Sequence, residues 1–242
     1  QLPNKVITAL AEDASGRLWV ATAGGLATIK DGLVSRPAAA EGFPSPIVPS
    51  LAAARDGSVW MGTDGAGVFQ YRSGHIRQFG TSAGLASLRI SAVYEDRNRT
   101  IWIGTPDAGF GRLRDGHAEF DPERHDPVTT FFEDREGNLW IGRVGALEQL
   151  ADGVIVTFSK AQGLLGDDVK SVSAGRDGTI WTATRGGVSD LGGTNPLSKR
   201  ESTPSVLSVV AASDGSLWVG TADAGLSHIE PKLTTKYTTK DG

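Results

Sequence analysis

The ten residues Glu133-Asp134-Arg135-Glu136-Gly137-Asn138-Leu139-Trp140-Ile141-Gly142 combine a polar, glycine-containing turn with the start of an apolar strand. Related turns precede every tryptophan of the chain, and successive tryptophans are 37 to 42 residues apart: Trp19, Trp60, Trp102, Trp140, Trp181 and Trp218. A period near 40 residues is typical of proteins built from one supersecondary unit per repeat. The chain is therefore predicted to be an array of six such units.

Alignment on the tryptophans predicts four short strands in each copy. The position twelve residues before tryptophan is always β-branched: Ile7, Val48, Ile90, Val128, Val169 and Val206. Three residues before tryptophan stands a glycine, except for Arg99, and glycine supplies the positive φ that a tight turn between strands needs. A further turn in four copies is Asp31-Gly32, Ser73-Gly74, Asp115-Gly116 or Asp152-Gly153, and an aromatic strand follows.

Four antiparallel strands in about 40 residues, repeated without a helical stripe, predict an all-β fold, a β-propeller of four-stranded antiparallel blades. We expect one domain, 1–242, with blades near 6–44, 47–86, 89–126, 127–167, 168–204 and 205–242. Six copies fit a closed six-bladed ring or part of a seven-bladed one, and we favour six. The tryptophans are expected to fill the gaps between neighbouring blades.

The motif resembles the two-component regulator propeller repeat. The resemblance rests on residues 133–142, on Tyr94-Glu95-Asp96 with Ile101-Trp102-Ile103-Gly104-Thr105, and on linkers such as Gln162-Gly163-Leu164, and it covers essentially the whole chain. It implies a non-catalytic, periplasmic sensor region of a membrane-anchored bacterial histidine kinase, hybrid regulator or diguanylate cyclase. The turn near Leu191-Gly192-Gly193 departs from the repeat.

Two other functions are consistent with this pattern. Streptogramin lyases share the turn-and-tryptophan motif, so a propeller lyase or hydrolase is one alternative, and a structural interaction platform is the other. A lyase would need catalytic histidines with a metal-assisted site. His75, His117, His125 and His228 form no ligand pair such as H-x-H, and the first two are predicted at the blade rim.

Composition argues against two further classes of partner, nucleic acid and membrane. The net charge is −4 with no long run of Lys or Arg, so nucleic acid is not expected as a partner. The chain has no cysteine, no apolar stretch near 20 residues and no initial methionine. We therefore expect no membrane contact by this segment itself, and a piece cut from a longer protein.

No cofactor or metal is predicted. The acidic pairs Glu12-Asp13, Glu95-Asp96 and Glu133-Asp134 occupy the same hairpin in different blades, so we expect them to cap turns and not to converge on one ion. The glycine pairs, including Gly24-Gly25, Gly186-Gly187 and Gly192-Gly193, precede no helix and do not predict a phosphate loop.

The candidate ligand-binding residues are those that break the repeat on one face. In a propeller, the loops between the second and third strands share a face with the linkers between blades. Arg143, where the other five copies have Thr, and Arg185 lie in adjacent blades, and the remaining candidates are Asp64, Asp107, Asp223, Arg89 and Asp168. Arginines opposite acids predict a pocket for a small anion, or else exposed charges in weak salt bridges.

The expected partner is a small polar solute or a protein bound on this loop face. The sequence leaves open the ligand, the output domain of the parent protein and whether the chain self-associates.

Overall fold

The computed structural model describes residues 1–37, 47–191 and 205–240. Its contacts divide the chain into two compact units, 1–128 and 129–242, and each unit is described by itself. Apart from short 3-10 turns such as η2 (Thr81–Ala83) and η3 (Lys160–Gln162), the described elements are strands. No helix in these residues is long and apolar enough to cross a membrane.

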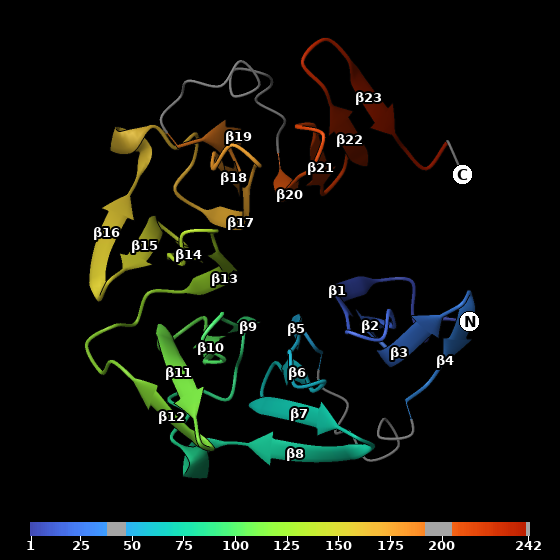
Figure 1. Ribbon diagram of the computed structural model, residues 1–242, viewed down its shortest axis with the longest axis vertical. Coiled ribbons are helices and arrows are strands. Elements are labelled where there is room, and N and C mark those ends of the chain that lie inside the picture. The colour runs from blue at the N-terminus through green and yellow to red at the C-terminus, as the bar shows by residue number, and fades with distance from the viewer. Residues whose placement is uncertain (38–46, 192–204, 241–242) are drawn as a thin grey trace. The chain divides into compact units, whose positions relative to one another are not determined.

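The first unit holds three four-stranded antiparallel sheets, in which each strand pairs with its neighbours in the chain (Figure 1). The first sheet is β1 (Ile7–Glu12), β2 (Leu18–Thr22), β3 (Gly25–Lys30) and β4 (Leu33–Ser35). The second is β5 (Ser50–Ala53), β6 (Val59–Gly62), β7 (Val68–Arg72) and β8 (His75–Phe79). The third is β9 (Ala92–Glu95), β10 (Ile101–Gly104), β11 (Phe110–Arg114) and β12 (His117–Phe120).

The second unit holds the other three sheets. The fourth sheet is β13 (Val128–Glu133), whose first residue ends the first unit, with β14 (Leu139–Arg143), β15 (Leu147–Ala151) and β16 (Val154–Phe158). The fifth is β17 (Val169–Ala174), β18 (Ile180–Thr184) and β19 (Gly187–Asp190). The sixth is β20 (Val206–Ala211), β21 (Leu217–Thr221), β22 (Leu226–Ile229) and β23 (Thr234–Tyr237).

These six sheets confirm the predicted all-β propeller fold of antiparallel four-stranded blades. Within the described residues the fifth sheet has three strands. The turn that departs from the repeat, with Gly192-Gly193, lies outside the described residues. The blade boundaries and the closure of the ring stay predictions.

The turns have the predicted backbone chemistry. In the first four sheets, the turn before the outer strand has two consecutive positive φ angles, for example 51° at Asp31 and 74° at Gly32, as the hairpin turn of type I′ requires. In the hairpins before tryptophan, the glycine has a positive φ, and Arg99 takes the same left-handed conformation with a φ of 62°. A non-glycine residue costs free energy in this conformation.

Four of the tryptophans pack against the next blade of the same unit, as predicted. Trp19 lies in one buried cluster with Val48 and Met61, and Trp60 lies in another with Ile90 and Val93. In the second unit, Trp140 clusters with residues of β17 and β18, and Trp181 clusters with residues of β20 and β21. These large apolar plates bury surface that a single blade cannot cover alone.

Close packing also explains the small residues of the blades. A Cβ on Gly62 would lie 2.6 Å from Cγ2 of Ile90, so the end of β6 has no room for a side chain. Hydroxyl groups of the first strands join adjacent blades: the Thr8 hydroxyl donates to the Val48 carbonyl at 2.7 Å, and the Val93 amide donates to the Ser50 hydroxyl at 2.9 Å. Small residues therefore allow adjacent blades to pack closely, and their hydroxyl groups form hydrogen bonds between the blades.

Candidate functional site

The aspartates of the acidic pairs serve the hairpins, as the sequence predicted, whereas Glu95 accepts the Arg55 amide of the neighbouring blade. Oδ2 of Asp13, Asp96 and Asp134 accepts a hydrogen bond from the indole Nε1 of the tryptophan six residues later, at 2.9, 2.9 and 2.8 Å. The Oδ1 atoms accept backbone amides of the turn. Among the described residues, no group of three or more His, Asp or Glu side chains has the arrangement of a metal site.

These bonds shift the acidity of Asp13. Burial would raise its pKa, but hydrogen bonds from the Ser15 hydroxyl, the Trp19 indole and backbone amides outweigh that effect and lower the pKa to about 2. The same balance lowers the pKa of Asp134. Both carboxylates are therefore fixed as anions that cap turns.

The other three blades have a different hairpin, which sequence reasoning missed. The capping aspartate is replaced by Ala54, Gly175 and Ala212. These replacements are visible in the sequence, six residues before each tryptophan. In these blades an aspartate two residues later, such as Asp56, accepts turn amides in its place. The tryptophans of these blades therefore lack the carboxylate that holds the indole N–H in the others.

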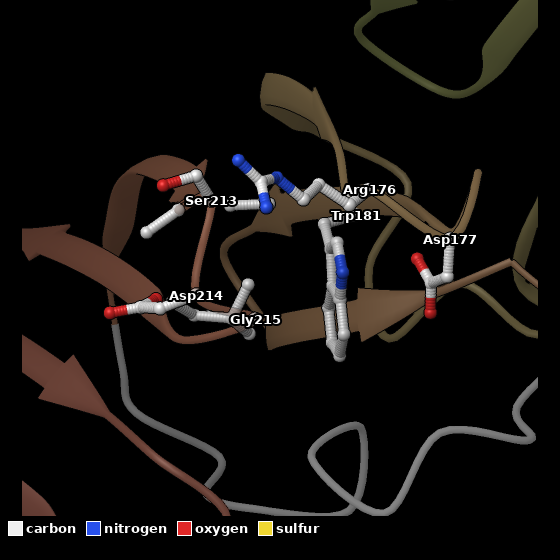
Figure 2. A pocket seen from close by; sticks show the side chains of 10 residues that line it. Arg176, Asp177, Trp181, Ser213, Asp214 and Gly215 are labelled. Carbon is white, nitrogen blue, oxygen red and sulfur yellow. The ribbon is translucent and has the colours of Figure 1, made fainter.

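Cavities lie beside two of these uncapped tryptophans. One, of about 300 Å³, lies between the hairpins of the fifth and sixth sheets and is lined by Trp181, Asp177 and Asp214. Figure 2 shows Trp181 between Asp177 and the Asp214–Gly215 turn, with Arg176 extending toward the turn that carries Ser213. The other, beside Trp60, is larger and belongs to the first unit.

At the opposite end of the blades, a repeated threonine organises the loop between the second and third strands. The Thr63 hydroxyl donates to the Gly67 carbonyl at 2.7 Å and accepts the Ala66 amide at 3.1 Å. Equivalent bonds are made by Thr22, Thr105, Thr184 and Thr221. This threonine is therefore a structural residue.

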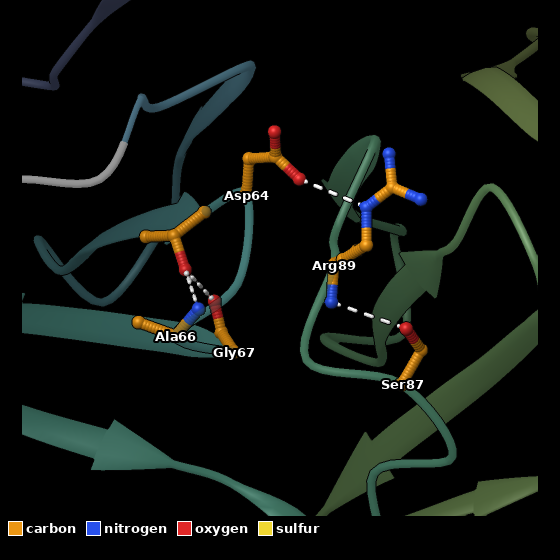
Figure 3. Close-up of polar contacts among 6 residues, drawn as sticks. Asp64, Ala66, Gly67, Ser87 and Arg89 are labelled. Atoms are coloured by element: carbon orange, nitrogen blue, oxygen red, sulfur yellow. Dashed lines mark hydrogen bonds and ion pairs between the residues drawn. The ribbon is translucent and has the colours of Figure 1, made fainter.

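Asp64 and Arg89 come together on this loop face. Arg89 Nε lies 3.0 Å from Asp64 Oδ1, and the two backbones form an isolated β-bridge, so the loop and the inter-blade linker do share a face (Figure 3). The hydrogen bond and charge of Asp64, with a smaller effect of Asp107, raise the pKa of Arg89. Both side chains of the ion pair are about half exposed.

A second cluster surrounds Asp168 in the second unit. Its Oδ2 lies 3.1 Å from Arg185 Nε and its Oδ1 lies 3.0 Å from Lys170 Nζ, so one carboxylate faces two cations. Asp168 is 20% exposed, whereas the Arg185 side chain is 78% exposed. Arg185 thus presents guanidinium N–H groups to solvent while one of them is held by Asp168.

Arg143 is not an exposed loop charge. Its side chain is 13% exposed, and Nη2 lies 3.3 Å from Oε1 of Glu148, which is 4% exposed. Glu148 occupies the position filled by Ala27, Phe69, Gly111, Ser189 and Ser227 in the other sheets, so the two charged residues break the repeat together. Glu148 was not predicted from the sequence, although it is a charged residue at a position that is uncharged in the other five sheets.

The predicted residues fall into separate groups within the two units. The first unit pairs Asp64 with Arg89, on which Asp107 has a smaller electrostatic effect, and the second brings Asp168 and Arg185 together with Lys170. Asp223 is exposed on its own loop. Their role in ligand binding stays a prediction.

The histidines have separate surroundings. His75 and His117 begin the outer strands β8 and β12 and are exposed, as predicted, and His125 is also exposed. His228 stacks on Trp218 with ring centroids 4.2 Å apart, and its Nε2 lies 2.8 Å from the Ser216 hydroxyl.

The repeats match a known family. Residues 1–24, 84–107 and 122–142 match the model of the two component regulator propeller. Three segments of the chain thus match two-component regulator propeller repeats. The resemblance read from the sequence is thus confirmed, and no curated protein matches the chain.

Solved structures share the propeller fold. The extracellular domain of the hybrid two component system BT3049 from B. thetaiotaomicron is 19% identical, with a TM-score of 0.72 over 100% of this chain and 36% of that one. Virginiamycin B lyase from Staphylococcus aureus is 16% identical, with a TM-score of 0.70 over 97% of this chain and 85% of that one. This chain spans 36% and 38% of the length of two structures from hybrid two component systems.

Proposed function

We propose that this regulator propeller is a non-catalytic sensory module, which binds a small polar solute or a protein partner outside the cytoplasm. In this proposal a membrane-anchored bacterial signalling protein contains the module. The observation that carries the proposal is the match of three segments to the two component regulator propeller model. The likeness to extracellular domains of hybrid two component systems supports it at the level of the fold.

The loop face supplies chemistry that suits a polar ligand. Arg185 and Arg89 are each held by one carboxylate through Nε, and the planar guanidinium has further N–H donors for a second partner. Because both side chains are more than half exposed, a solute can reach them without unfolding the loops. An exposed ion pair contributes little to stability, so the arginines can exchange partners at small cost.

A thermal-shift screen tests this proposal. Neutral sugars, sugar acids and amino acids would be added to the purified chain, since a ligand of the native state raises the melting temperature by mass action. We expect a compound that stabilises the wild type and loses this effect in Arg89→Gln or Arg185→Gln.

The control for this screen is Arg112→Gln. Arg112 is also an exposed, salt-bridged arginine, but it lies in β11 and pairs with Glu119 of the neighbouring strand. A stabilising compound whose effect survives both loop-face variants would place the binding surface elsewhere, and a screen without any stabilising compound would contradict small-solute sensing.

The likeness to a lyase over nearly the full length of both chains favours one alternative, a propeller lyase. Its test is incubation with quinupristin, the compound named in a complex with an inactive variant of that lyase, and mass-spectrometric analysis of the product. We expect the compound to be recovered unchanged. Turnover that disappears in a folded His117→Ala, His125→Ala or His228→Ala variant would establish the lyase instead.

A further inference from the structure

A cavity of about 690 Å³ lies between the second and third sheets, beside the uncapped Trp60. It opens at the hairpin end of these blades, away from the loops that hold Asp64 and Arg89. Four arginines from separate parts of the first unit line it: Arg72, Arg77, Arg99 and Arg114. The lining carboxylates are Asp56 and Asp115, so the charged side chains around the cavity carry a net charge of about +2.

One arginine is neutralised within the protein. Arg72 Nη1 lies 3.3 Å from Asp56 Oδ2. Burial would raise the pKa of Asp56, but hydrogen bonds from Ser58 and the charges of Arg72 and Arg99 lower it, so this carboxylate is an anion. Arg77, Arg99 and Arg114 form no ion pair with a carboxylate of residues 1–37, 47–191 or 205–240.

Two of these guanidinium groups are held in place by neutral contacts. Arg114 donates through Nε and Nη2 to the buried Thr100 hydroxyl, at 3.3 and 2.9 Å. Arg77 stacks over the Phe79 ring, 4.6 Å from its centroid, and its Nη2 lies 2.9 Å from where a Cβ of Gly116 would be. Their remaining N–H donors are available at fixed positions, which lowers the entropic cost of binding a ligand.

The two blades that enclose the cavity are tied together beside it. The Arg55 amide donates to Glu95 at 2.8 Å, and Arg55 Nη1 donates to the Arg97 carbonyl at 2.8 Å. Trp60 also lines the cavity, and Ala54 stands where an aspartate accepts the indole N–H in three other blades. The cavity is therefore a preformed space with several donors and excess positive charge.

We propose that this cavity binds a small solute through an oxyanion group, a carboxylate or a sulfate or phosphate. Arg77 and Arg114 contact the oxyanion, and Arg99 at the tip of the β9–β10 hairpin adds a third positive charge. Arginine suits this role because its planar N–H groups match the oxygens of such anions. The ionised Asp56 accepts hydroxyl or amide donors elsewhere on the solute.

Titration calorimetry with sulfate, succinate and neutral succinamide tests this site. We expect sulfate or succinate to bind and succinamide not to bind, and the tighter anion identifies the geometry that the cavity prefers. Arg114→Gln should weaken binding about tenfold or more, since a hydrogen bond to a charged group is lost. Arg112→Gln is the matched control in the same strand, where Arg112 pairs with Glu119, and should bind as the wild type does.

A second variant tests the uncapped tryptophan. Ala54→Asp restores the arrangement of the first, third and fourth blades, so it should occupy the Trp60 N–H and weaken anion binding. The matched control is Ala212→Asp, the same change in the sixth blade. Melting temperatures verify that each variant is folded.

Failure of both anions to bind at millimolar concentration would overturn the proposal, as would equal binding by the wild type and a folded Arg114→Gln. Because the loop-face variants Arg89→Gln and Arg185→Gln leave this cavity intact, failure of this site is distinguishable from failure of the sensory function.

Discussion

At the scale of single residues, the six hairpins use two different arrangements to provide an acceptor for their turn amides. Where an aspartate begins the turn, as in Asp13, it binds the turn amides and the tryptophan indole together. Where Ala54 or Gly175 takes that place, a later aspartate binds the turn alone. The sequence predicted that the acids cap turns, but the second role of Asp13 was missed because it depends on where the indole points.

Arg99 occupies a position that favours glycine, so its replacement should stabilise the protein. Arg99→Gly removes the left-handed strain at φ 62° and should raise the free energy of unfolding by about 0.5–1 kcal/mol. Urea unfolding measures the change. The reciprocal variant Gly137→Arg, at the same place in the fourth sheet, should destabilise the protein by a similar amount. A lower free energy of unfolding in Arg99→Gly would contradict the claim that Arg99 is strained.

Asp13 should make the free energy of unfolding depend on pH. Its pKa is about 2 in the folded protein and 3.8 ordinarily, so the ionised carboxylate stabilises the fold above about pH 4, and this contribution is lost as the pH falls toward 2. The difference in unfolding free energy between wild type and Asp13→Asn should therefore shrink from pH 6 to about pH 2.5. Asp223→Asn on an exposed loop is the control, and a difference independent of pH would contradict the assignment.

At the scale of the element, the fourth sheet departs from the repeat by a pair of changes. Arg143 replaces the threonine that closes the loop elsewhere, and Glu148 on the next strand compensates its charge. The sequence identified Arg143 as exceptional because the other five copies have Thr. Its burial was not predictable from that position alone, since a loop residue is ordinarily exposed.

Substitutions of Arg143 and Glu148 should have coupled effects on the free energy of unfolding. Arg143→Thr restores the common residue but leaves Glu148 buried without this partner, and it should destabilise the protein by about 3 kcal/mol. The double variant with Glu148→Ser, the residue of the fifth and sixth sheets, should recover most of that loss. A double-mutant cycle from urea unfolding measures the coupling, and additive effects would show that the ion pair contributes nothing.

At the scale of the whole molecule, the tryptophan period was sufficient to predict the repeat unit, the strand order and the packing of blades. Those features follow from local turns and from residues at a fixed spacing. The arginine-lined cavity was not predicted, because Arg77, Arg99 and Arg114 are separated in sequence and meet only when two blades pack. The lining of this cavity depends on residues outside the repeat pattern, whereas the pattern itself specifies the fold.

The central claim, that this propeller binds a solute without transforming it, is tested most directly by one titration. The compound with the largest thermal shift would be titrated into the purified chain, and the mixture would then be analysed by mass spectrometry. We predict saturable binding, recovery of the compound unchanged and, at a hundredfold excess over the dissociation constant, a stabilisation of about 2.7 kcal/mol or roughly 5–10 °C. Conversion of the bound compound, or the absence of saturable binding, would contradict the account.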